Sequence, residues 1–144
     1  MISVALLCGC SHAPIPVSDE APAFSPSPAG SQRLAAELGV EIISLRTTAG
    51  GHMLDLRYRV TDPDKARAVL RENSQIDIQI LDMTTGTALM VGESDLGKLR
   101  TKSTKPKRTK VYYSLFDNPG AAVKTGAEVA VKFGSVRVDG IRVE

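Results

Sequence analysis

The chain has 144 residues, of which 42% are hydrophobic and 24% charged, and its formal net charge is +2. This length and composition fit one soluble domain with a short extension. No apolar run reaches the roughly 20 residues of a membrane-spanning helix. Two cysteines and two histidines are too few for a disulfide scaffold or a classical zinc module.

The first nine residues form a short apolar stretch that ends at Cys10. Its length is typical of the hydrophobic part of a signal peptide. The sequence Leu7-Cys8-Gly9-Cys10 resembles a bacterial lipobox, in which the final cysteine receives the lipid and becomes the new first residue. No basic residue precedes the run, which indicates a true start further upstream. We expect residues 1–9 to be a lipoprotein signal peptide and Cys10 to be acylated, as in palmitate-bearing lipoproteins. The alternative is a buried terminal strand.

A proline-rich segment follows Cys10. Five of the eight prolines lie between Ser11 and Gln32, namely Pro14, Pro16, Pro22, Pro26 and Pro28. Such a composition favours an extended chain without helix or strand. We predict a tether over residues 10–36 and a folded domain over 37–144. By resemblance to proteobacterial lipoproteins, Ser11 after the cysteine implies a periplasmic location at the outer rather than the inner membrane.

From Leu38 onward, apolar and polar residues mostly alternate with the period of two that is typical of β-strands. The predicted strands cover residues 40–47, 54–60, 76–82, 87–91, 111–116, 128–133 and 136–143, with a bulge at Gly140. One helix is expected at Pro63–Glu72, because Asp62 is a good N-cap and proline suits the first helical position. We therefore predict an all-β, immunoglobulin-like antiparallel sandwich of about seven strands with one short crossover helix. A small β-barrel is the alternative.

Several segments resemble a group of small exported bacterial proteins of unassigned function. They are GHMLDLRYRVTDPDKARAVL, TTGTALMV, VYYSLFDNPGAAVKTGAEVAV and FGSVRVDGIRVE, together with the basic loop between the second and third of them. The resemblance covers roughly residues 51–144. It implies an exported bacterial domain, and because the group has no established activity it assigns no catalytic residues to this chain.

The strongest electrostatic feature is a basic loop over residues 98–110, which contains no acidic residue. Its cations are Lys98, Arg100, Lys102, Lys105, Lys107, Arg108 and Lys110. Without them the chain would carry 11 basic and 16 acidic residues, so the positive net charge comes from this loop. Such a patch can hold an acidic protein, lipid head groups or lipopolysaccharide. The alternative is a solvated loop that balances an acidic body.

These features predict a non-catalytic binding or accessory module of the cell envelope, with no cofactor. No nucleophile–base pair or phosphate-binding glycine loop is recognisable. Nucleic acid is disfavoured because no aromatic residues interleave with the basic ones. A glycan-binding module is disfavoured by the absence of tryptophan. Of Tyr112 and Tyr113, next to the basic loop, one should face the core and the other solvent.

The alternative function is periplasmic copper binding. His52, Met53, Met83 and Met90 offer the imidazole and thioether donors that suit Cu(I). Methionine also fills irregular gaps in protein cores, and adjacent strand residues such as His52 and Met53 point to opposite faces. A Cu(I) titration separates this hypothesis from the first.

Overall fold

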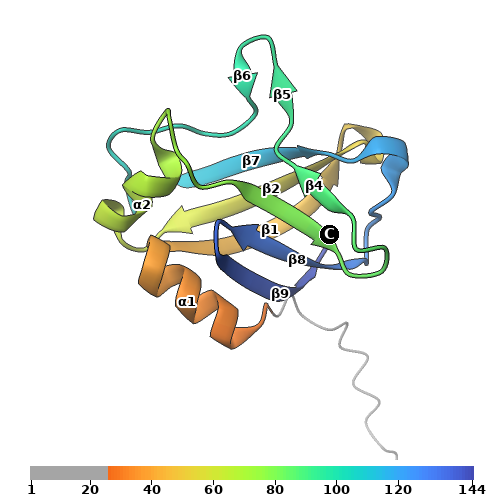
Figure 1. The fold of residues 1–144 in the computed structure, drawn as a ribbon, viewed down its shortest axis with the longest axis horizontal. Coiled ribbons are helices and arrows are strands. Elements are labelled where there is room, and N and C mark those ends of the chain that lie inside the picture. The colour runs from red at the N-terminus through yellow and green to blue at the C-terminus, as the bar shows by residue number, and fades with distance from the viewer. Residues whose placement is uncertain (1–25) are drawn as a thin grey trace, which may run out of the picture.

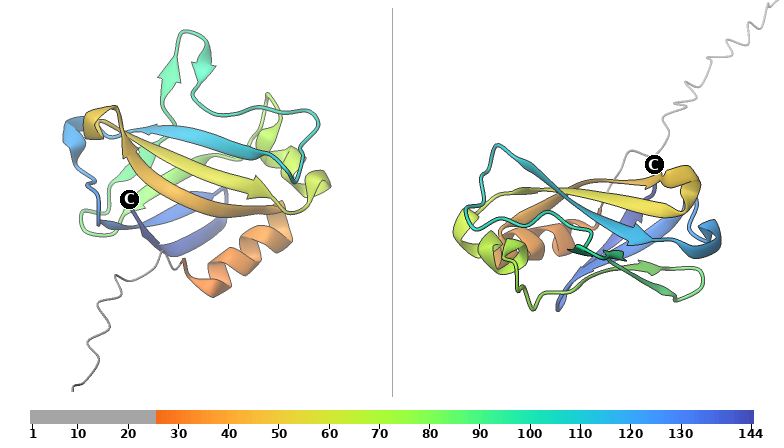
Figure 2. Two further views of the ribbon diagram at one scale, coloured as in Figure 1. Left: turned by 180° about the vertical axis from the view of Figure 1, so that it is seen from behind. Right: turned by 90° about the horizontal axis from the view of Figure 1, so that it is seen from above.

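A computed structural model describes residues 26–144 and contains two stacked antiparallel sheets (Figures 1 and 2). The first sheet has the order β1-β2-β7, with bounds Val40–Thr48, Met53–Val60 and Val111–Asp117. The second has the order β4-β3-β8-β9, with bounds Ala88–Met90, Ile78–Asp82, Glu128–Phe133 and Val136–Arg142. The sheets do not close into a barrel. The prediction of an all-β antiparallel sandwich is therefore confirmed, and the barrel alternative is wrong.

The strand order is immunoglobulin-like. Among the seven strands of the two sheets, the first, second and fifth along the chain form one sheet, and the third, fourth, sixth and seventh form the other. In the immunoglobulin fold the third, sixth and seventh strands likewise share a sheet, and a further strand can lie beside the third, as β4 does here. The short β4 thus forms one edge of the second sheet.

The core follows from the alternation of residues along the strands. On β2, the side chains of Leu54, Leu56 and Tyr58 are fully buried between the sheets. Tyr58 stacks on Tyr112 of β7 with 6.2 Å between ring centroids, and it meets the edge of Phe133 from the opposite sheet at 5.6 Å. These three rings join the two sheets near the end of the sandwich where α2 lies.

Helix α1 (Pro28–Leu38) occupies residues that the sequence analysis expected to be extended. Proline is tolerated at Pro28 because the first turn of a helix needs no amide donor there. Leu34 and Gly30 are buried, and the helix packs against β9 and β1 (Figure 1). Gly39 ends it in the left-handed conformation with φ of 63°. The expected extended tether is therefore wrong for residues 28–36, because α1 belongs to the folded domain.

Helix α2 (Pro63–Leu70) connects the two sheets and confirms the predicted helix, ending two residues earlier than predicted. The carboxylate of Asp62 accepts hydrogen bonds from the amides of Asp64 and Lys65, at 3.0 and 3.4 Å. The predicted bulge is also present, because the pairing of β8 and β9 shifts across Asp139 and Gly140. No helix in residues 26–144 is long and apolar enough to cross a membrane.

Two polar side chains hold the turns at one end of the sandwich. The buried Asn118 amide donates to the carbonyls of Gly51 and Val123, at 2.7 Å each, and its oxygen accepts from the Val123 amide at 3.0 Å. The carboxylate of Asp82 accepts from the amide of Thr84 at 2.9 Å and from the Thr85 hydroxyl at 2.7 Å. These bonds lower the pKa of Asp82 below its ordinary value.

A two-stranded ribbon, β5 (Glu93–Ser94) and β6 (Gly97–Lys98), projects from the body (Figure 1). The chain pairs with β7 on both sides of it, through the bridges Val91–Phe116 and Arg100–Ser114. At the stem, the amide of Leu99 donates to the carbonyl of Gly92 at 2.8 Å. The ribbon is thus an excursion from one edge position of the first sheet, and Leu96 at its tip is 95% exposed.

Candidate functional site

The basic loop is anchored to the domain at several points. The amide of Thr101 donates to the carbonyl of Tyr113 at 2.9 Å, and the amide of Ser103 donates to the carbonyl of Leu70, at the end of α2, at 2.8 Å. The amide of Lys107 donates to the hydroxyl of Tyr112 at 2.8 Å. Pro106 between these points is buried. The loop therefore lies along α2 and the start of β7 and presents its side chains from a fixed backbone.

Three of the seven predicted cations have structural roles. Lys98 pairs with Asp77, with 3.2 Å between its Nζ and the carboxylate oxygen, and Lys102 pairs with Glu72. Arg100 is only 9% exposed and points between the two sheets. Lys98 and Lys102 are thus paired with acidic side chains of the domain, and Arg100 is buried in it.

The other four cations are exposed and make no ion pair within residues 26–144; they are Lys105, Lys107, Arg108 and Lys110. Lys110 also lies 5.7 Å from the ring centroid of Tyr112. Arg71, just after α2, is likewise exposed without an ion pair in the described part of the chain. We call these five residues the basic end.

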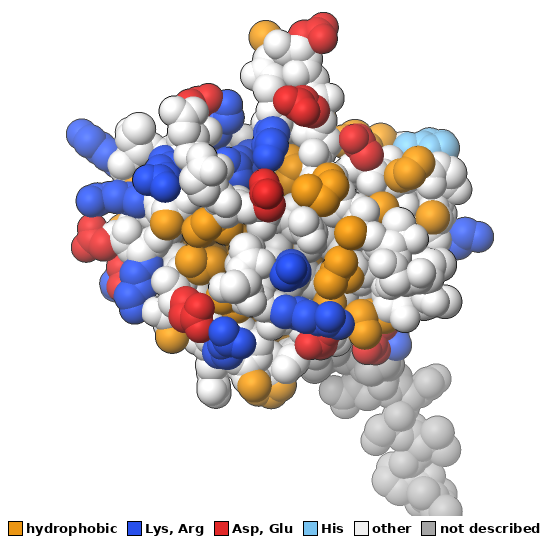
Figure 3. Space-filling view, in the orientation of Figure 1, with side chains coloured by type: hydrophobic (Ala, Val, Ile, Leu, Met, Phe, Trp, Pro, Cys, Tyr) orange, Lys and Arg blue, Asp and Glu red, His pale blue; other side chains and the backbone are white. Residues whose placement is uncertain are grey.

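Hollows in the surface separate α2 from the basic loop. One is lined by Arg67, Arg71, Ser103 and Thr104, and Lys105 lines the next along the loop. The two hollows adjoin each other, because Ser103 and Thr104 line both. Lysine and arginine side chains gather at this end of the molecule, where α2 and the loop lie (Figure 3). Arg71 could not be assigned to this surface from the sequence, because it lies 27 residues before Lys98.

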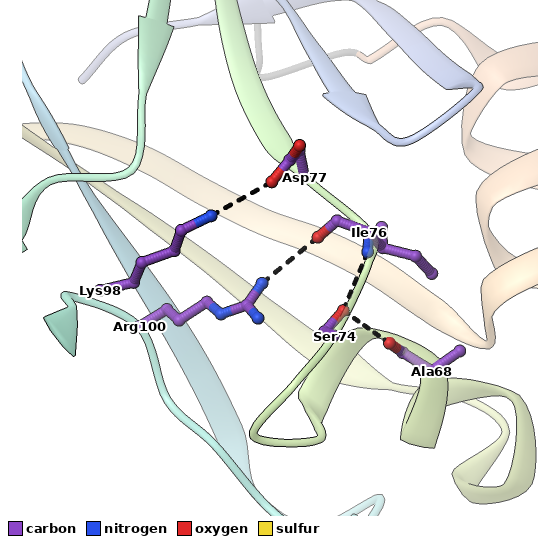
Figure 4. A network of polar contacts seen from close by, with 6 residues as sticks. All are labelled: Ala68, Ser74, Ile76, Asp77, Lys98 and Arg100. Atoms are coloured by element: carbon purple, nitrogen blue, oxygen red, sulfur yellow. Dashed lines mark hydrogen bonds and ion pairs between the residues drawn. The ribbon is translucent and has the colours of Figure 1, made fainter.

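Arg100 crosses from the edge of the first sheet toward the second. Its guanidinium donates to the carbonyl of Ile76 at 3.3 Å, as Figure 4 shows beside the Lys98–Asp77 pair. The acceptor segment is itself fixed, because the amide of Ile76 donates to the hydroxyl of Ser74 at 3.1 Å and this hydroxyl donates to the carbonyl of Ala68 at 2.7 Å. Arg100 makes no ion pair with any residue in the described range 26–144.

Two buried hydroxyls lie in the core near Arg100. Those of Tyr58 and Ser114 have no hydrogen-bond partner of normal geometry among the described residues. Burial raises the pKa of Tyr58 to about 12, against the opposing effects of the neighbouring Ser114 hydroxyl and the Arg100 charge.

The structure separates the four residues of the copper hypothesis. His52 lies just before β2 and Met53 begins this strand of the first sheet, whereas Met83 and Met90 belong to the β3–β4 hairpin of the second. Met90 pairs with Gln79, and Gln79 lies four residues before Met83. The two methionines are therefore about 13 Å apart along the strand direction. The sulfur of Met83 instead accepts from Arg137 of β9 at 3.3 Å. No site with all four donors forms.

The remaining predicted residues divide between the described and undescribed parts of the chain. Tyr112 is fully buried and Tyr113 is 46% exposed on the outer face of β7, as the alternation predicted. The predicted lipidation residue, Cys10, lies outside the described residues. No group of three or more histidine, cysteine or acidic side chains within residues 26–144 is arranged to hold a metal ion.

Comparisons with protein families, with curated proteins and with solved structures found no match to this chain.

Proposed function

We propose that this chain is a non-catalytic lipoprotein of the bacterial cell envelope whose basic end binds an anionic, phosphate-rich membrane surface. One observation carries the proposal. Five exposed cations lie together at one end of the domain and make no ion pair within residues 26–144. Of the other three cations of the basic loop, Lys98 and Lys102 are paired with acidic side chains and Arg100 is buried. A surface charge that no neighbour neutralises is available to a partner.

The anchored backbone supports this role. Because the amides of Ser103 and Lys107 are bonded to the domain, the lysines between and beside them start from fixed positions. Binding then costs less conformational entropy than it would from a free loop. Each lysine or arginine near an anionic surface contributes about 1 kcal/mol, and this attraction falls within the Debye length of about 8 Å at physiological salt.

The lipobox-like sequence supplies a second, independent contribution. A lipid anchor on Cys10 and the polybasic surface would each attract the chain to a membrane. From Cys10 to Pro26 the chain spans 16 residues, which can extend at most about 55 Å. Acylation would therefore hold the basic end at a high local concentration near the membrane.

Vesicle binding tests this proposal. Full-length protein carrying Cys10→Ala is mixed with zwitterionic vesicles and with vesicles that contain anionic phospholipid. We expect binding only to the anionic vesicles, weakening as salt is added. The variant Lys105→Glu/Lys107→Glu should bind at least about tenfold more weakly, since it removes two attractions and adds two repulsions.

A matched control separates the basic end from net charge. Lys124 and Arg142 are also exposed without an ion pair in the described residues, and they lie outside the basic end. The variant Lys124→Glu/Arg142→Glu changes the net charge equally and should retain most of the binding. Equal losses in the two variants would contradict a role for the basic end. Failure to distinguish the two vesicle types would contradict the membrane assignment.

A further inference from the structure

A small, partly enclosed cavity opens at the edge of the sandwich where the projecting ribbon meets the second sheet. Its volume is about 170 Å³. Arg100 and Lys98 reach it from the ribbon side, and Asp77 faces them from the segment that leads into β3 (Figure 4). The cavity is separate from the basic end.

Arg100 is the unusual member of this cavity. Its side chain is more than nine-tenths removed from solvent, yet no carboxylate within residues 26–144 pairs with it. Arginine is almost never buried to this degree without a partner, because removing its charge from water is costly. A guanidinium has five N–H donors, and the carbonyl of Ile76 takes one hydrogen bond from them. The guanidinium therefore retains donors, and a charge, for a ligand in the cavity.

The other walls define what such a ligand can be. Lys98 and Asp77 neutralise each other at 3.2 Å, and Glu93 adds a further carboxylate at the rim. A second negative charge on the ligand would meet these acids unfavourably. Ile78, Met90 and Val91 form an apolar side. At about 170 Å³ the cavity is smaller than the roughly 300–1,000 Å³ of sites for drug-sized ligands.

We propose that this cavity binds a small aliphatic monocarboxylate, with its carboxylate on the Arg100 guanidinium and its hydrocarbon chain on the apolar side. The planar fork of arginine matches a carboxylate through two parallel hydrogen bonds. The hydrophobic contacts select a short alkyl chain over a bare inorganic anion. This activity goes beyond the membrane contact proposed above and does not depend on it.

Calorimetric titration of the full-length Cys10→Ala protein with butyrate tests the proposal. We expect saturable binding of butyrate and none of butanol, which has the same chain without the charge, and weaker binding of inorganic phosphate, which has the charge without the chain. Arg100→Gln should weaken butyrate binding at least about tenfold, the effect of losing a charge-assisted pair. Lys124→Gln, at an exposed position outside both the basic end and the cavity, should leave it unchanged. Equal affinity for phosphate and butyrate, or equal loss in the two variants, would overturn the assignment.

A measurement on unsubstituted Arg100 guards against a folding defect in the variant. In amide NMR spectra of the Cys10→Ala protein, butyrate should shift the resonances of Ile78, Val91 and Arg100 along a saturating curve. Shifts confined to residues 105–110, or a linear response without saturation, would refute the cavity as the binding site. The calorimetric and NMR titrations contain no vesicles. A negative result in either would therefore leave the membrane proposal unaffected.

Discussion

Replacing Gly30 by alanine tests whether α1 is part of the folded domain. A Cβ atom at this position would lie 2.7 Å from the carbonyl oxygen of Arg137 and 2.9 Å from the Cα of Val138, both in the backbone of β9. Contacts this short do not persist, so the helix or the strand would have to move. Gly30 is therefore the residue that lets α1 approach the sheet closely.

The expected change in stability has the opposite sign from helix propensity. Alanine is about 0.8–1 kcal/mol more favourable than glycine within an exposed helix. Forcing an extra methyl group into a packed contact costs about 1–3 kcal/mol. Moving α1 outward would also loosen the packing of Leu34, which is 1% exposed. We expect Gly30→Ala to lower the free energy of unfolding by about 1–2 kcal/mol.

Urea unfolding followed by circular dichroism measures this difference. Gln32→Ala is the control, because Gln32 is exposed on the same helix and its substitution should change stability by less than about 0.5 kcal/mol. A gain of about 1 kcal/mol in Gly30→Ala would refute the reasoning, since it is the result for a helix that does not touch β9. Leu34→Ala gives a second reading of the same contact, with an expected loss of about 2–5 kcal/mol.

Three further substitutions test the polar groups of the domain. Asn118→Ala should lower the free energy of unfolding by about 3 kcal/mol in urea titrations, since it leaves the carbonyls of Gly51 and Val123 and the amide of Val123 without their partner. Asp82→Asn should destabilise the protein most at neutral pH; because the folded state lowers the pKa of this carboxyl, the difference from wild type should shrink as the pH falls below 3.8, and a pH-independent difference would contradict this. Tyr58→Phe should leave stability within about 1 kcal/mol of wild type at neutral pH, as its hydroxyl has no normal partner. Wild type should also lose stability between pH 10 and 12, where the unfolded tyrosine ionises and the buried one does not, and Tyr58→Phe should lose less in the same titrations.

The strands were predictable because alternation and turn chemistry agree in the same segments. In β2, the buried Leu54, Leu56 and Tyr58 alternate with Asp55 and Arg57, so the sequence marks both faces of the strand. Helix α1 was missed for the opposite reason. Its first residues have the composition of a linker, and the buried Leu34 has few other apolar residues in the helix to mark a face. Its burial comes from β9, which lies about 100 residues further along the chain.

The site residues were likewise predictable only where neighbours in the sequence determine their role. The charge of the basic loop is visible in the sequence, but its division into paired and free cations is not. Asp77 and Glu72 neutralise Lys98 and Lys102 from 21 and 30 residues away. The burial of Arg100 likewise depends on the segment around Ile76, which only the stacking of the two sheets brings close.

The ribbon of β5 and β6 is a segment whose length can change without disturbing the two sheets. Its stem is closed by the hydrogen bond between Leu99 and Gly92, and pairing with β7 is made on both sides of that point. Residues 93–98 can therefore be lengthened, shortened or exchanged without shifting the register of any strand in the two sheets. Because Glu93 and Lys98 at its base line the cavity, a change in the ribbon alters what the cavity admits while the core stays the same. The ligand preference of the cavity can therefore change through the ribbon while the two sheets stay the same.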